Sequence, residues 1–242
     1  MKLSVVIPAF NEEARLPQTL RDACGWLDAH LNEANCFDDY DLLVVDDGSS
    51  DGTVAAVAQL CADYARLKLL QQGENRGKGA AVRSGMLAVD GDIRLFMDAD
   101  HSTHIEELVK GWPLLLDGAD VVIGSRQHRQ SDIVQHQSWL RESMGKCFNR
   151  MMRSMTGITL QDTQCGFKLF TAAAAEQLFA QQQADGFSFD VELIYLAQQA
   201  GMRVEEIPVR WINESNSRVR MLIDPIHMAA DIARIRRWHR HG

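Results

Sequence analysis

The chain has 242 residues, 46% of them hydrophobic and 24% charged, which suits one globular domain with a sizeable core. Its formal net charge of −8 argues against general nucleic-acid binding. The five cysteines form no CxxC pair and are odd in number, so they predict reduced thiols in a cytosolic compartment. The sequence has neither the pattern of a signal peptide nor an apolar run long enough to span a membrane.

Residues 1–124 alternate short β-branched runs with helical patterns, which predicts an α/β fold with a mostly parallel sheet flanked by crossover helices. The expected strands are 3–8, 41–46, 67–71, 93–97 and 121–123. The expected helices are 12–32, 53–65, 78–89 and 105–117. Fully apolar runs such as 42–45 indicate strands that are covered on both faces.

Beyond residue 125 the pattern becomes mixed. Apolar residues at helical spacing predict a long helix over 139–155, followed by a strand at 167–170 and helices at 172–181 and 190–200. A strand at 203–210 precedes a final helix over 225–238. This half contains two basic stretches, 126–168 and 218–240, whereas the first half is acidic. We expect a single domain over 1–242, because the sequence shows no repeat or long linker.

Polar residues follow the ends of several predicted strands, and open α/β sheets bind ligands at the carboxyl ends of their strands. Asp98 and Asp100 follow the fourth strand, one residue apart, and can offer oxygen ligands to Mg²⁺ or Mn²⁺. Such a metal stabilises charge on a departing diphosphate. The alternative is that Asp98-Ala99-Asp100 is only a strand-end turn that caps the following helix.

Two further segments suit a nucleotide. Asp46 and Asp47 can accept hydrogen bonds from a base or ribose, or they can simply form a turn with Gly48 before a helix cap. The segment 75–79 places glycines and cations at a helix start, which suits phosphate, although a flexible helix start explains it too.

These motifs together resemble family 2 of the inverting glycosyltransferases, which have the GT-A fold. The resemblance covers roughly residues 3–220 and rests first on SVVIPAFNEE at 4–13, VDDGSSDGT at 45–53, NRGKG at 75–79 and DAD at 98–100. Within the family the chain is most similar to polyprenyl-phosphate transferases, above all the dolichyl-phosphate glucosyltransferases. This finer resemblance rests on GSR at 124–126, DTQCGFK at 162–168, FSFDVE at 187–192 and IPVRW at 207–211.

The resemblance implies a role for each matching residue. Residues 1–124 would bind the nucleotide-sugar, and residues 125–242 would form the acceptor side. The nucleotide-sugar would contact Pro8, Ala9, Phe10, Glu12, Asp46, Asp47, Lys78, Asp98, Ala99 and Asp100, with the metal on Asp98 and Asp100. The acceptor would contact Arg126, Arg141, Lys168 and Arg218. The catalytic set would be Asp98, Asp100, Arg126, Arg141, Asp162 and Asp190, with Glu192 on the same side.

A polyprenyl-phosphate acceptor needs no dedicated base, because a phosphate monoester is largely anionic at neutral pH. If the acceptor were a saccharide hydroxyl, Asp162 or Asp190 would be the candidate base. A non-catalytic nucleotide-sugar-binding module is the second alternative. The basic helices 139–155 and 226–240 suit an anionic membrane surface, which predicts a peripheral protein on the cytoplasmic face. The sequence leaves open uridine or guanosine, glucose or mannose, and the oligomeric state.

Overall fold

The computed structural model describes residues 1–32, 36–134, 160–212, 231 and 233–239. In these residues seven strands form one sheet in the order β3-β2-β1-β4-β7-β5-β8. Their bounds are β1 (Lys2–Ala9), β2 (Asp39–Asp46), β3 (Leu67–Gln71), β4 (Ile93–Met97), β5 (Val121–Ser125), β7 (Phe167–Thr171) and β8 (Val204–Pro208). All neighbours pair in parallel except β7, which runs antiparallel to β4 and β5.

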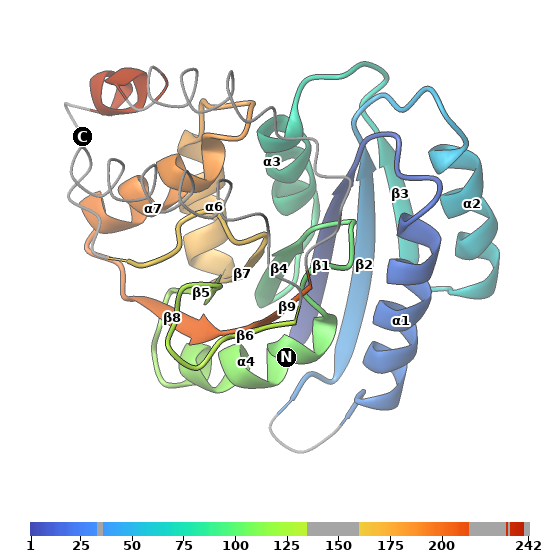
Figure 1. Ribbon diagram of the computed structural model, residues 1–242, viewed down its shortest axis with the longest axis horizontal. Coiled ribbons are helices and arrows are strands. Elements are labelled where there is room, and N and C mark those ends of the chain that lie inside the picture. Colours follow the sequence, from blue (N-terminus) through green and yellow to red (C-terminus); the bar gives the residue numbers. More distant parts are fainter. Residues whose placement is uncertain (33–35, 135–159, 213–230, 232, 240–242) are drawn as a thin grey trace.

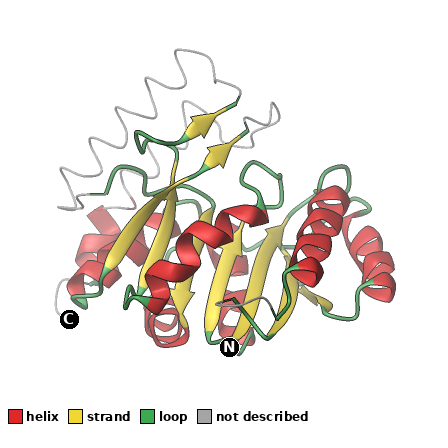
Figure 2. Ribbon diagram, turned by 90° about the horizontal axis from the view of Figure 1, so that it is seen from below, coloured by secondary structure: helices red, strands yellow, loops and turns green. Residues whose placement is uncertain are grey.

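Helices cover both faces of this sheet, as Figures 1 and 2 show. Helices α1 (Leu16–Ala29), α2 (Thr53–Asp63) and α4 (Leu108–Leu116) pack on one face, and a 3-10 turn (Ile105–Glu107) precedes α4. Helices α3 (Lys78–Ala88), α6 (Ala172–Gln181) and α7 (Phe189–Gln199) pack on the other. Alternate residues of one strand serve the two layers: Val5 and Ile7 face the first, and Val6 faces the second. The apolar strands of the sequence are thus buried on both sides.

The predicted fold class is confirmed, and several elements match the predicted bounds closely. Strands 67–71 and 93–97 and helix 172–181 have their predicted ends. The single strand predicted over 203–210 is wrong, because β8 ends at Pro208 and β9 (Arg210–Trp211) pairs with β6 (Asp132–Ile133) in a second sheet. Proline has no N–H to donate, so a ladder readily stops there. The short strand β6 has no counterpart among the predicted elements.

Other predictions fall on residues outside the described ranges. The helix expected over 139–155 lies there, as does the first part of the helix expected over 225–238. Residues 231 and 233–238 are helical. Among the helices that the structure describes, none has both the length and the apolar character needed to cross a bilayer.

The reversed strand β7 determines which residues reach the functional edge of the sheet. Phe167 pairs with Met97 at the end of β4, and Lys168 pairs with Ile123 in β5. Because β7 runs against its neighbours, its first residue lies beside their last ones. The segment 162–166, which precedes β7, therefore stands at the carboxyl edge of the parallel strands.

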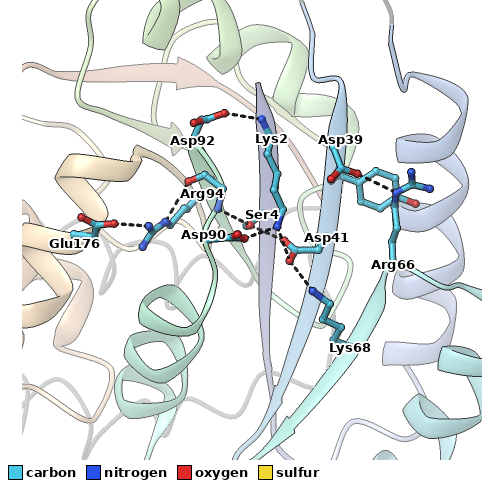
Figure 3. Close-up of polar contacts among 12 residues, drawn as sticks. Lys2, Ser4, Asp39, Asp41, Arg66, Lys68, Asp90, Asp92, Arg94 and Glu176 are labelled. Carbon is cyan, nitrogen blue, oxygen red and sulfur yellow. Dashed lines mark hydrogen bonds and ion pairs between the residues drawn. The ribbon is translucent and has the colours of Figure 1, made fainter.

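A network of polar and charged side chains lies at the opposite edge of the sheet, where the parallel strands β1, β2 and β4 begin (Figure 3). The buried Asp41 carboxylate accepts from Ser4 Oγ at 2.5 Å and pairs with Lys68 Nζ at 3.0 Å. Arg94, also buried, donates to the carbonyl of Met86 at 2.8 Å and to Glu176 at 2.8 Å. Buried charges need such partners. The buried charges of Asp41 and Arg94 are thus paired within the protein.

Candidate active site

Three of the predicted site residues follow the ends of β4 and β5. Asp98 and Asp100 follow β4, and Arg126 follows β5. The N–H of Asp98 donates to the carbonyl of Gly166 at 3.0 Å, which fixes the segment before β7 against the Asp98-Ala99-Asp100 turn. A Cβ at residue 166 would lie 1.9 Å from Asp98 Oδ2, so only glycine allows this approach. The tertiary fold thus joins two motifs that are far apart in the sequence.

Asp98 is the centre of a charged group. Lys78, the first residue of α3, places Nζ 2.7 Å from Asp98 Oδ1 and 5.3 Å from the centroid of the Phe96 ring. Burial raises the pKa of Asp98; Lys78 opposes this rise, whereas the charges of Asp100 and Asp190 add to it. The pKa remains raised overall, which means that the carboxylate would gain from additional positive charge.

Asp98 and Asp100 present two carboxylates on one turn, which is a donor set suited to a divalent cation. Within the described residues no group of three or more His, Cys, Asp or Glu side chains is arranged to hold a metal. Two carboxylates suffice when phosphate oxygens and water supply the remaining ligands of Mg²⁺ or Mn²⁺. Asp100 Oδ1 also accepts the N–H of Ser102 at 3.0 Å, so the turn and a metal site are compatible. The chemistry of the donor set, two carboxylates one residue apart on the turn after β4, is what fits a hard cation here.

Arg126 forms a bidentate ion pair with Asp162. Its Nε and Nη2 donate to the two carboxylate oxygens at 2.7 and 2.9 Å, and its backbone N–H donates to Oδ2 at 3.0 Å. The guanidinium also lies 5.7 Å from the centroid of the Trp211 ring. Burial would raise the pKa of Asp162, but Arg126 outweighs it and holds that pKa below its usual range. Asp162 is therefore an orienting anion for Arg126 and a poor proton acceptor.

Lys168 and Asp190 form a second pair, beneath the surface of the site. Lys168 Nζ contacts Asp190 and donates to the carbonyl of Cys165 at 2.6 Å, and Lys168 is only 1% exposed. Its ammonium lies 5.8 Å from the centroid of the Phe96 ring, on which Lys78 also sits. A direct contact with the acceptor would require Asp190 or Cys165 to give up this ammonium group. The structure thus places Lys168 in a buried ion pair, and its contact with the acceptor stays a prediction.

The two aspartates after β2 organise the loops around them. Asp46 accepts from the N–H groups of Gly48 and Ser49 at 3.2 Å, which is the turn that the sequence also allowed. Asp47 accepts from the N–H groups of Arg76 at 2.8 Å and Gly77 at 2.9 Å. Asp47 therefore ties the β2–α2 connection to the segment that opens α3, and it fixes the backbone beside Lys78.

The glycines of the segment 75–79 serve close packing. A Cβ on Gly77 would lie 2.4 Å from the carbonyl oxygen of Asp185, and one on Gly79 would lie 2.5 Å from that of Ala184. The N–H of Ala80 donates to the Asp185 carbonyl at 3.2 Å. Because protein carbonyls crowd this helix start, a phosphate-binding role here rests on the Lys78 side chain.

The segment after β1 carries the remaining predicted donor residues. Pro8 and Ala9 are the last residues of β1 and pair with Val45 and Asp46. Phe10 is partly buried and follows directly. The buried carboxylate of Glu12 accepts from Arg15 Nε at 2.8 Å and Nη2 at 2.7 Å. The Glu12 side chain thus takes part in a local ion pair.

Asn11, which has no predicted role, joins the segment after β1 to the β2–α2 connection. Asn11 has a φ of 53°, and its Oδ1 accepts the N–H groups of Ser50 at 2.7 Å and Asp51 at 3.3 Å. Asparagine tolerates the left-handed region better than most residues. An Asn shortly after a predicted strand could therefore have indicated a tight turn at this position. Arg141 and Arg218 lie outside the described residues.

A mostly parallel sheet with an Asp-x-Asp turn, an oriented arginine and a lysine at its carboxyl edge defines a glycosyltransferase of the GT-A type. The chain belongs to glycosyl transferase family 2, whose model matches residues 4–179. It is 35% identical over 241 residues to dolichyl-phosphate beta-glucosyltransferase of Dictyostelium discoideum, covering 97% of this chain and 73% of the relative. The human protein of that name is 33% identical over 246 residues, covering 97% and 75%.

The fold of this chain is also similar to the folds of solved structures. One is glucosyl-3-phosphoglycerate synthase of Mycobacterium tuberculosis, in complex with Mn²⁺, UDP-glucose and phosphoglyceric acid. Its TM-score is 0.63 at 20% identity, with 97% of this chain and 78% of that chain covered. At this identity the likeness concerns the fold alone.

Proposed function

We propose that the protein transfers glucose from UDP-glucose to dolichyl phosphate or a related polyprenyl phosphate, with inversion at the anomeric carbon. The observation that carries this proposal is the meeting of Lys78, Asp98 and the Arg126–Asp162 pair at one sheet edge. The choice of glucose and of a lipid phosphate is supported by the names of the relatives, which match nearly the whole chain. We also infer that residues 1–124 and 125–242 act as one domain, because strands of both halves share one sheet.

On the donor side, Lys78 and the Asp98–Asp100 pair would receive the diphosphate. Lys78 Nζ, which pairs with Asp98 and lies over the Phe96 ring, would contact a phosphate oxygen of the donor. A bound Mg²⁺ or Mn²⁺ on Asp98 and Asp100 would supply stabilisation of the negative charge on the departing UDP. The order imposed by Asp47 on the backbone around residues 76 and 77 holds Lys78 ready for this contact.

On the acceptor side, the ion pairs favour a phosphate over a hydroxyl. A hydroxyl acceptor needs a base, but Asp162 is held by Arg126 and Asp190 by Lys168. A phosphate oxygen is already anionic and can attack the anomeric carbon directly, while the C1–O bond to UDP breaks on the opposite face. Arg126, oriented by Asp162, would attract and align that phosphate.

Contact with a membrane surface would bring such a lipid acceptor to the site. On the helical residues 233–238, Arg234, Arg236 and Arg237 are exposed, and Trp238 is 41% exposed. Phe187, before α7, is also exposed. Cationic and aromatic side chains of this kind support association with an anionic leaflet, and we place the protein at the cytoplasmic face.

The test is transfer of radiolabelled glucose from UDP-glucose into an organic-extractable product. We expect transfer that requires dolichyl phosphate, and GDP-mannose should not replace the donor. Glucose transfer to a saccharide in the absence of lipid phosphate would contradict the proposed polyprenyl-phosphate acceptor. Donor binding without turnover on either acceptor would instead make the protein a binding module.

A further inference from the structure

The segment 182–188, between α6 and α7, lies against the first turn of α3. Its Asp185 carbonyl accepts the N–H of Ala80 at 3.2 Å, and Gln182 Nε2 donates to the carbonyl of Gly79 at 2.9 Å. Arg83 of α3 pairs with Asp185 at 2.9 Å. The backbone that directly follows Lys78 is thus held by residues about a hundred positions later in the chain, whereas Asp47 holds the backbone before it.

The Glu192 side chain on α7 fixes the backbone of this segment by hydrogen bonds. Its side chain is fully buried, and its carboxylate accepts the N–H groups of Gln183 at 3.0 Å and Ala184 at 2.7 Å. A buried carboxylate is stable only when its oxygens are hydrogen-bonded or paired with a cation. The conformation of 183–184, which abuts Gly79, therefore depends on how well Glu192 is satisfied.

The remaining partner of Glu192 comes from the end of the chain. His239 Nε2 lies 2.7 Å from Glu192 Oε1, and this ring nitrogen donates, since the carboxylate can only accept. Eight residues earlier, Asp231 accepts from Ser188 Oγ at 2.6 Å. Ile235, midway between them, is completely buried. Residues 231, 235 and 239 share one helical face, and that face is docked on 188–192.

We propose that His239 and Glu192 are positioning residues for Lys78. They form a latch through which the docked C-terminal helix fixes segment 182–188, and that segment in turn fixes the start of α3. Donor affinity then depends on the C-terminal helix through segment 182–188. This inference rests on the proposed donor site and adds a residue of the last helix to its support.

The experiment measures the Kd of UDP in the presence of Mn²⁺ by calorimetry, for the full chain carrying His239→Ala. We expect binding about fivefold weaker than in the wild type, which is the size typical of coupling between distant sites. His239→Gln, whose amide can donate to Glu192, should recover most of the loss. The matched control is His30→Ala, since His30 is half-buried on Trp26 and lies at the end of α1. It should leave the Kd unchanged.

A double-mutant cycle separates positioning from a general loss of stability. In a Lys78→Ala background, His239→Ala should change the Kd of UDP by less than about 1.5-fold, because the group that it positions is gone. An equal loss in both backgrounds, or a lower melting temperature with an unchanged Kd, would overturn the latch. A wild-type protein that binds no UDP would refute the proposed function itself, and the two failures are therefore distinguishable.

Discussion

Gly166 offers the sharpest test of how the site is built, because it is the point at which the segment before β7 touches Asp98. In Gly166→Ala the new Cβ would lie 1.9 Å from Asp98 Oδ2 and 2.2 Å from its Cγ. Non-bonded atoms need about 3.5 Å, so the carboxylate must move by roughly 1.5 Å. A shift of about 1 Å in a reacting group can cost about a hundredfold. We therefore expect kcat/KM to fall about a hundredfold, or about 2.7 kcal/mol.

The assay is transfer of glucose from UDP-glucose to dolichyl phosphate, together with Mn²⁺ affinity measured by electron paramagnetic resonance. Both should fall, while the circular dichroism spectrum keeps its native shape. Gly25→Ala is the matched control, because a Cβ there meets nothing within 4 Å on α1. If Gly166→Ala kept kcat/KM within about threefold of the wild type, the contact with Asp98 would not be the constraint that we infer.

Three further outcomes are expected. Chelation with EDTA should abolish transfer, and Mg²⁺ or Mn²⁺ should restore it; transfer that persists in EDTA would exclude the proposed cofactor. Asp100→Asn should lower kcat by at least about tenfold with little change in melting temperature, since Asp100 is partly exposed. Asp162→Asn should destabilise the fold by about 3 kcal/mol at pH 7, because it leaves Arg126 without its anion. The folded-state pKa of Asp162 is lowered, so its stabilisation is complete above the unfolded pKa of about 4 and is lost at lower pH. Urea unfolding of Asp162→Asn and wild type should therefore converge below pH 4, and a constant difference would contradict this account.

Much of the fold and part of the site followed from local sequence patterns. Apolar runs of strand length between helical periodicities predicted the parallel part of the sheet, because a strand buried on both faces must be apolar throughout. The same pattern placed Asp46 and Asp98 at strand ends, since right-handed crossovers bring all carboxyl ends of parallel strands to one edge. Arg126 was predicted from the family resemblance alone. Arg141 and Arg218 remain predictions, because they lie outside the described residues.

The sequence by itself could not give the direction of β7, since the periodicity of a strand is the same in either direction. That direction decides which residues join the site: it brings Gly166 to Asp98 and keeps Lys168 beneath the surface. Likewise, only the tertiary structure shows which group forms a hydrogen bond or ion pair with each carboxylate. Asp47 bonds to the start of α3, and Glu192 bonds to His239. Local patterns determine where a charged side chain leaves the backbone, whereas burial and the approach of distant segments decide what neutralises it.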